Sequence, residues 1–207
     1  MVVVTDAEPR QRTVKRLDPP ALKALAHPLR VRILASLRRI GPATATVLAE
    51  RLGESSGLTS YHLRVLAAHD FVVEDTEQGI GRERWWRAAQ DMTSWRASEF
   101  AGDPDSEAAE QFLAGMAARS SMAALDRWLD QRPTADPEWV DAAELSDYIL
   151  RVTPDQLRSL EDEINALIKS RLDAGELTSD EPGTRQIRLL LYGFPDAGER
   201  AADRGET

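Results

Sequence analysis

Proline and glycine divide residues 18–69 into four short helices, and this punctuation restricts what the front of the chain can fold into. Asp18 is a typical N-cap with Pro19 at the first helical position, and Leu22 and Leu25 share one face of a helix over 18–26. The His27-Pro28 step ends this helix, because a residue before proline is pushed out of the helical region. The later helices have similar boundaries: Pro28 to Gly41-Pro42, Thr44 or Thr46 to Gly53, and Ser55 or Ser56 to about His69.

The fourth of these helices has a buried face and a polar face. At about 100° per residue, one arc collects the apolar positions with His62, so we expect His62 to pack in the core rather than to read DNA bases. The opposite arc is polar and includes Ser60, Tyr61 and Arg64. Small hydroxyls and arginine can bond phosphates or base edges, although an ordinary solvated face has the same composition. The candidate DNA contacts on this helix are Ser55, Ser56, Thr59, Ser60, Tyr61 and Arg64. The apolar arc consists of Leu58, His62, Leu63, Val65 and Leu66.

A β-hairpin is predicted after the fourth helix, from the apolar run 71–73, a turn containing Gly79 and Gly81, and the run 82–87. Arg82 and Arg84 are two residues apart on a strand and share one face, which suits phosphate contact and equally suits a charged, solvated edge. Trp85 and Trp86 point to opposite faces, so we expect one to pack on the core and the other to lie against the back half of the chain. Three helices followed by a hairpin is the winged-helix order.

Two segments carry a family likeness. The run Ala24-Leu-Ala-His-Pro-Leu-Arg-Val-Arg-Ile-Leu34 resembles the opening of ArsR-type winged helix-turn-helix regulators of bacteria, and Thr59-Ser-Tyr-His-Leu-Arg-Val-Leu66 followed by Phe71-Val72 resembles their recognition helix. The stretch 79–87 is similar to the wing of longer, arginine-rich members. This resemblance implies a cytosolic, homodimeric transcription regulator whose fourth helix enters the major groove and whose wing touches the DNA backbone. Asp70 replaces the usual glycine, and Asp also visits left-handed conformations.

Metal sensing and catalysis are not expected. The chain has no cysteine, and its three histidines, His27, His62 and His69, all lie in the front half, so the metal sites of the family do not carry over. No cluster has metal-ligand spacing, and no nucleophile, base and acid can be ordered into a catalytic set. We therefore predict no enzyme activity and no cofactor.

Charge differs sharply between the two halves. Residues 1–88 hold 14 Lys and Arg against 10 Asp and Glu, whereas residues 89–207 hold 12 against 25, which together give the net charge of −9. This asymmetry is typical of a half that binds a polyanion joined to a half with another role. The chain has no apolar run of the length that a membrane helix or a signal peptide needs, so we expect a cytoplasmic protein without membrane contact.

The back half is predicted to be helical followed by a small α/β part. A long helix over about 105–131 has a wide apolar stripe that a small winged domain cannot cover, so we expect it to build a homodimer together with the first helix. The residues assigned to this interface are Leu22, Leu25, Phe112, Met116, Leu125, Trp128 and Leu129. A strand over 145–152, a helix opened by the capping box Thr153-Pro-Asp-Gln156, and a strand over 187–194 then predict a β-α-β unit.

The fold class expected is therefore mainly α with small β. We expect a flexible basic arm over 1–17, a winged helix-turn-helix domain over 18–98, a dimerisation and effector part over 99–195, and a disordered tail over 196–207. The predicted function is a sequence-specific regulator, expected to act as a repressor, that binds double-stranded DNA. Trp128, Trp139 and Tyr148 are candidates to line a pocket for a small organic effector. The alternative is a winged-helix module for protein contacts whose acidic half binds a basic partner.

Overall fold

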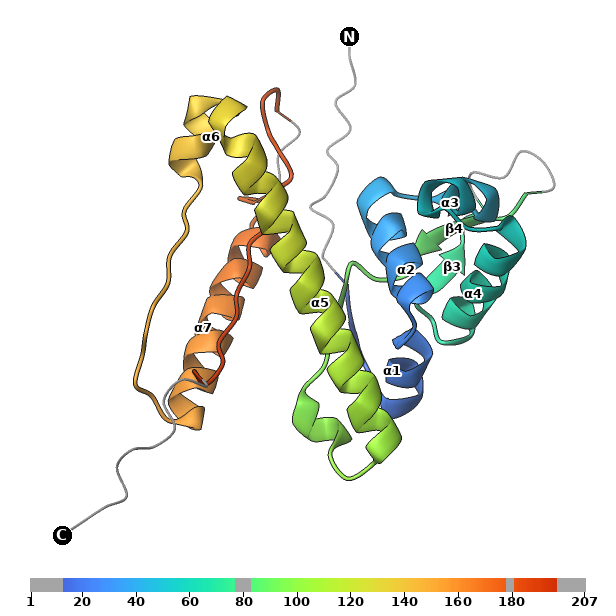
Figure 1. Cartoon of the computed structure of the whole chain (residues 1–207), viewed down its shortest axis with the longest axis horizontal. Coiled ribbons are helices and arrows are strands. Elements are labelled where there is room, and N and C mark those ends of the chain that lie inside the picture. Colours follow the sequence, from blue (N-terminus) through green and yellow to red (C-terminus); the bar gives the residue numbers. More distant parts are fainter. Residues whose placement is uncertain (1–12, 77–82, 178–180, 197–207) are drawn as a thin grey trace. The chain divides into compact units, whose positions relative to one another are not determined.

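The computed structural model describes residues 13–76, 83–177 and 181–196, which form two compact units divided after Asp130 (Figure 1). The first unit contains the predicted winged domain and the long helix, and the second contains the part from Gln131 onward. No helix in these three ranges combines the length and the apolar character that crossing a membrane requires.

Four helices open the first unit where the sequence predicts them: α1 (Pro19–Leu25), α2 (Pro28–Ile40), α3 (Ala45–Leu52) and α4 (Ser56–Ala68). The caps explain their boundaries. The Asp18 carboxylate accepts a hydrogen bond from the Ala21 amide at 2.8 Å, and the His27 Nδ1 accepts one from the Leu29 amide at 3.1 Å. Both caps precede a proline at the start of the helix, so chain direction is reset between α1 and α2.

A three-stranded antiparallel sheet completes the winged domain. It comprises β2 (Ala43–Thr44), β3 (Val72–Glu74) and β4 (Trp85–Ala88) in the order β2-β4-β3, with Val72 opposite Ala88. The predicted hairpin is thus confirmed at both strands, while its turn with Gly79, Gly81 and Arg82 lies outside the described residues. Trp86 is buried in the core, and Trp85 on the opposite face is half-buried.

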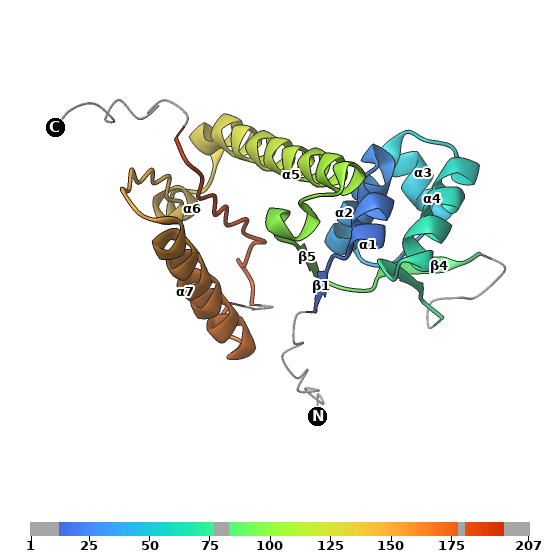
Figure 2. The ribbon, with the colours of Figure 1, turned by 90° about the horizontal axis from the view of Figure 1, so that it is seen from below.

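The described end of the predicted N-terminal arm is ordered. Residues 14–16 form β1 (Val14–Arg16), which pairs in parallel with β5 (Met92–Ser94), so the expectation that order begins at Asp18 is wrong (Figure 2). The Thr13 amide donates to Asp91 Oδ2 at 2.8 Å, and Arg16 forms an ion pair with Glu99. This pairing joins residues almost 80 positions apart, and local periodicity holds no signal for it.

The core of the first unit explains a second correction. Leu22 and Leu25, assigned above to a dimer interface, are 0% and 5% exposed within a single chain, because α1 packs its apolar face into the same core as α2 and α4. They are therefore unavailable to a partner. Ala109 and Leu113 of α5 (Pro104–Gln131) are buried in this core too, with Phe112 partly buried beside them.

The remainder of α5 has an apolar side that the chain covers only in part. The helix is continuous to Gln131. Leu125 and Trp128 are half-buried, and Met122 and Leu129 on the same side are exposed. Met116 is half-buried on the opposite side of the helix, the side of Ala109 and Leu113. The first half of α5 thus belongs to the core, and the second half presents apolar side chains that are not fully buried.

The second unit is built around α7 (Pro154–Asp173), preceded by η2 (Arg132–Thr134) and α6 (Pro137–Ala142). The capping box of α7 is confirmed. The backbone N–H of Gln156 donates to the Thr153 hydroxyl at 3.2 Å, and the side-chain Oε1 of Gln156 accepts from the backbone N–H of Thr153 at 2.9 Å. η2 and α6 were not predicted, because they are too short to show a period. A mainly helical chain with a small sheet, as predicted, is what the structure shows.

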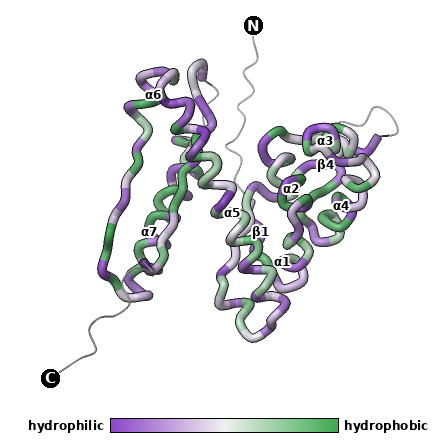
Figure 3. Tube along the Cα trace, in the orientation of Figure 1, coloured by the Kyte–Doolittle hydropathy of each residue, from purple (hydrophilic) through white to green (hydrophobic). Residues whose placement is uncertain are grey.

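Two segments of this unit differ from the prediction in detail. Residues 145–152 and 187–194 include several hydrophobic residues, which Figure 3 colours green, but neither segment is hydrogen-bonded to a described strand. The second segment lies against α7 instead, since a Cβ built on Gly193 would be 2.6 Å from Glu161 Oε1 and 3.0 Å from Leu157 Cδ1. A segment with a strand-forming sequence does not become a β-strand unless a second strand pairs with it by hydrogen bonds.

Candidate nucleic-acid interface

A three-residue turn holds α3 and α4 in a fixed relation. Gly53 ends α3 in the left-handed conformation, with φ of 69°, which a residue without Cβ adopts without strain. Two residues later the Ser55 hydroxyl accepts a hydrogen bond from the Leu58 amide at 3.3 Å and starts α4. The result is two short helices joined by a tight turn, with the N-terminal part of α4 at the surface.

The polar face of α4 is partly as predicted. Ser56, Tyr61 and Arg64 are exposed and Ser60 is half-buried, so these side chains can meet a ligand. Ser55 is exposed as well, with its oxygen engaged in the cap.

Thr59 does not belong to this face. It is fully buried, so its assignment as a DNA contact is wrong, and Leu58, expected in the core, is 42% exposed instead. The buried face is centred between Thr59 and Leu66, about 40° further round the helix than the apolar pattern indicated.

His62 packs in the core as expected. It is 4% exposed, and its ring centroid lies 4.4 Å from that of His27 at the start of α2. Its buried Nδ1 has no hydrogen-bond partner among the described residues. Burial lowers the pKa of His62, and the neighbouring His27 and Arg30 lower it further, so the ring is neutral near pH 7.

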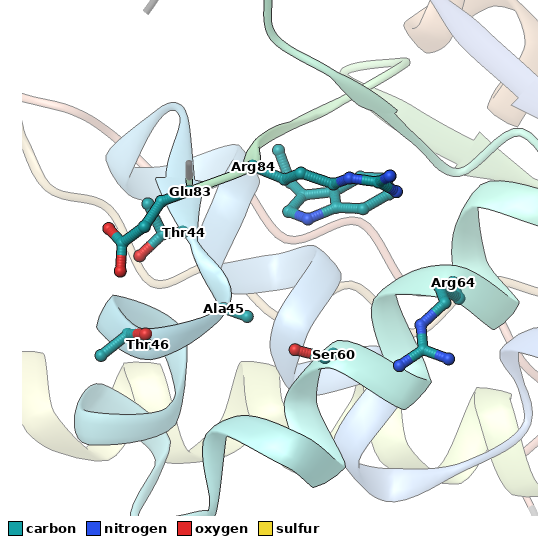
Figure 4. A pocket seen from close by; sticks show the side chains of 8 residues that line it. Thr44, Ala45, Thr46, Ser60, Arg64, Glu83 and Arg84 are labelled. Carbon is teal, nitrogen blue, oxygen red and sulfur yellow. The ribbon is translucent and has the colours of Figure 1, made fainter. Parts of the chain in front are cut away.

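A cleft with a volume of about 380 Å³ lies between α3, α4 and the described part of the wing. Figure 4 shows the side chains that line it. Ser60 and Arg64 reach it from α4, and Arg84 reaches it from the strand side. The structure therefore brings together three of the predicted DNA contacts, whereas Ser55, Ser56 and Tyr61 lie outside the cleft lining. Arg82 is outside the described residues. The full lining comprises Thr44, Ala45, Thr46, Ser60, Arg64, Glu83, Arg84 and Trp86.

Thr46 is a cleft residue that the sequence analysis considered only as a helix cap. It is exposed at the first turn of α3, while Thr44 supplies the cap by accepting from the Val47 amide at 3.3 Å. An exposed hydroxyl at a helix N-terminus is a typical donor to a phosphate oxygen. The signal available in the sequence was the pair of threonines two residues apart, of which a helix can use only one as its cap.

The electrostatics of the cleft are mixed. Arg64 and Arg84 supply positive charge, and Arg84 Nε lies 3.9 Å from Glu74 Oε1 on the adjacent strand. Glu83 adds a carboxylate to the lining, which repels phosphates but can accept a hydrogen bond from the amino group of cytosine. The arrangement thus combines two arginines for phosphate or guanine with hydroxyls and one acceptor for base edges.

Two of the expected effector residues, Trp139 and Tyr148, lie in the second unit. Trp139 is half-buried under Arg185, whose guanidinium carbon lies 5.3 Å from the ring centroid, and Tyr148 is 76% exposed. The cleft beside α6 runs from Arg132 to Ala143 and includes neither of these aromatic side chains. Trp128 belongs to the other compact unit.

Metal binding is tested by the side chains themselves. Within 13–76, 83–177 and 181–196, no group of three or more His, Cys, Asp or Glu is placed to hold an ion.

The comparison with protein families gives a match in the region that contains α3 and α4. A family model described as a helix-turn-helix domain matches residues 25–75, which include α2, α3 and α4 and the first strand of the hairpin. The search of curated proteins gives no match to this chain. The match covers about a quarter of the chain and ends before the wing arginines and α5.

Proposed function

We propose that the chain is a sequence-specific DNA-binding transcription regulator that acts as a homodimer. The observation that carries this proposal is the cleft in which Ser60 and Arg64 of α4 meet Arg84 of the wing, next to the exposed Thr46. The match of residues 25–75 to a helix-turn-helix domain supports DNA as the ligand.

Each element has a distinct role in this proposal. α4 enters the major groove, where Ser60, Tyr61 and Arg64 face base edges and the adjoining backbone. Arg84 and Thr46 contact phosphates on either side of α4 and fix its orientation. Arg82, two residues before Arg84, adds a second phosphate contact in the wing.

The homodimer uses the second half of α5. Met122, Leu125, Trp128 and Leu129 form an apolar stripe that is only partly covered within one chain, as obligate interfaces are before assembly. Two-fold symmetry then presents two α4 helices about 34 Å apart, one turn of DNA. Such a dimer bound over a promoter excludes other proteins from it, which favours repression.

The test starts from DNA selected out of a random pool by the wild-type protein. Fluorescence anisotropy then measures the affinity of variants for the selected and for unrelated DNA at several salt concentrations. Replacing Ser60 or Arg64 with alanine removes base contacts, so the preference for selected DNA falls by about 5- to 150-fold for each base that is no longer read. Arg84→Ala weakens binding to both DNAs equally and reduces the salt slope by roughly 1 for each phosphate that a subunit no longer neutralises.

Arg158→Ala is the matched control, because Arg158 is an exposed arginine on α7, paired with Asp155 at 2.7 Å, in the other unit. It leaves both affinities unchanged. Absence of a salt-sensitive complex with any DNA would overturn the proposal and favour the alternative, a winged-helix module for protein contacts. An equal loss in Arg158→Ala would show that the arginine variants report net charge only.

A further inference from the structure

Residues 145–152 have a sequence suited to a β-strand but belong to no described sheet. The segment reads Leu-Ser-Asp-Tyr-Ile-Leu-Arg-Val, rich in residues that favour strands, and in Figure 1 it runs extended from α6 to the start of α7. No described strand pairs with it. An open apolar edge of this kind is a template for another chain, and proteins normally cover or charge such edges.

The described residues of the second unit also form no buried core. None of the described residues after Gln131 is buried, and Ile149 is 91% exposed and Tyr148 76% exposed. A unit of this size must remove apolar surface from water to offset the entropy of ordering its chain. A partner that covers the apolar surface of 145–152 would supply this burial.

The charges of the segment indicate what that occupant is. Asp147 and Arg151 are its two charged residues, and they lie symmetrically two positions on either side of Ile149. When two copies of 145–152 pair antiparallel about Ile149, Asp147 of each copy lies directly opposite Arg151 of the other. Ile149 then lies opposite its own equivalent, and Tyr148 opposite Leu150. A second copy of this chain supplies this complement without any other partner.

We propose that residues 145–152 of two chains pair as an antiparallel ladder centred on Ile149, giving the dimer a contact separate from α5. The backbone ladder and the apolar side chains supply the affinity, and the two Asp147–Arg151 pairs fix the register. The proposal rests on the homodimer proposed above and not on DNA binding, so absence of DNA binding would leave it unaffected.

Because the chain has no cysteine, a single introduced thiol reports proximity without background. In the full-length Ile149→Cys variant, the two thiols lie on directly opposite residues, with Cα atoms about 4.5 to 5.5 Å apart, within disulfide reach. In the Tyr148→Cys variant the equivalent residues are diagonal and about 8 Å apart, which is too far. Leu189→Cys, 72% exposed in the other extended segment, is the second control. Mild oxidation is expected to give roughly tenfold more disulfide-linked dimer for Ile149→Cys than for either control.

Mixed variants test the register. Asp147→Cys and Arg151→Cys each lie about 13 Å from their own equivalent, so neither cross-links alone, but an equimolar mixture of the two cross-links. Asp147→Arg places like charges opposite each other and raises the dimer dissociation constant by about 3- to 30-fold, and Asp147→Arg/Arg151→Asp restores it. Equal cross-linking of all single variants, no cross-linking in the mixture, or a monomer at high micromolar concentration would each overturn the proposal. A stable dimer that never cross-links at Ile149 would do the same while leaving the α5 contact standing.

Discussion

Asp70 links α4 to β3 through a left-handed backbone, and it is the one non-glycine residue with positive φ, 56°, in the described ranges. Its amide donates to Ala67 O at 3.0 Å and the Phe71 amide donates to Leu66 O at 2.9 Å, so the turn is held at both sides. Asp70→Ala loses the local bonding that lets Asp tolerate this conformation and lowers the free energy of unfolding by about 1 kcal/mol. Asp70→Gly removes the backbone strain, so the free energy of unfolding falls by less than in the alanine variant. Urea unfolding of both variants checks this order, and greater stability of the alanine variant would contradict it.

The His27–His62 pair predicts a pH dependence of stability. Burial is the largest cause that lowers the pKa of each ring below its usual 6.5, with Arg30 adding to it and Glu54 opposing it at His62. The unfolded chain therefore gains protons before the folded one, so stability falls as pH decreases below about 6.5 and levels off only below the folded pKa values. A proton on His27 Nδ1 would also remove the cap of α2.

Urea unfolding between about pH 8 and pH 5 measures this effect. His62→Gln keeps a polar side chain but cannot titrate, so its stability depends less on pH than that of the wild type. His69→Gln removes a histidine outside the pair and serves as the control. Retention of the full pH dependence in His62→Gln, or its loss in His69→Gln, would contradict the assignment.

Residue roles on α4 show how far a sequence pattern reaches. The outward positions of Tyr61 and Arg64 and the buried position of His62 follow from helical periodicity alone. Thr59 and Leu58 do not, because a threonine methyl can pack in a core and a leucine can lie at its edge, and the rotation of a short helix is set by all its neighbours. A helical wheel considers only the residues of the helix itself and not the neighbours that pack against it.

At the scale of elements, the correction at α1 gives a stability prediction. Leu22 is fully buried in the chain's own core, so Leu22→Ala leaves a cavity and lowers the free energy of unfolding by about 2–5 kcal/mol. Leu129, 41% exposed on α5, is the counterpart: Leu129→Ala changes unfolding by about 0.5 kcal/mol or less but weakens the proposed dimer. Thermal unfolding and sedimentation of both variants separate the effects. Comparable unfolding losses at a protein concentration where the chain is monomeric would show that Leu129 packs within its own chain and would contradict this prediction.

Helices and strands were predictable to different extents for a physical reason. Helix ends are set by local caps such as Asp18, Thr153 and Gly53, so their boundaries are visible in sequence. A strand exists only with its partner, and the partner of β1 lies far along the chain. For 145–152 the partner proposed here lies in another molecule, and the symmetric placement of Asp147 and Arg151 is the sequence feature that points to it.

For the whole molecule, the front part of the sequence and the part beyond residue 88 carry opposite electrostatic tasks. The described arginines of the cleft lie in the unit that binds DNA in our proposal, whereas most carboxylates lie beyond residue 88. Both dimer contacts proposed above, along α5 and along 145–152, join segments of that acidic part. DNA binding therefore brings opposite charges together, while dimerisation brings together two parts that both have a negative net charge.

This difference predicts opposite responses to salt. Residues 89–207 hold 25 Asp and Glu against 12 Lys and Arg, so two such parts repel each other at low ionic strength, where the Debye length exceeds about 10 Å. Raising salt from about 50 to 500 mM screens this repulsion and lowers the dimer dissociation constant, while affinity for DNA falls steeply because counterions are no longer released as favourably. Sedimentation equilibrium without DNA and anisotropy with DNA, on one preparation, measure the two responses. Parallel weakening of both would show that ion pairs rather than apolar surface hold the dimer together.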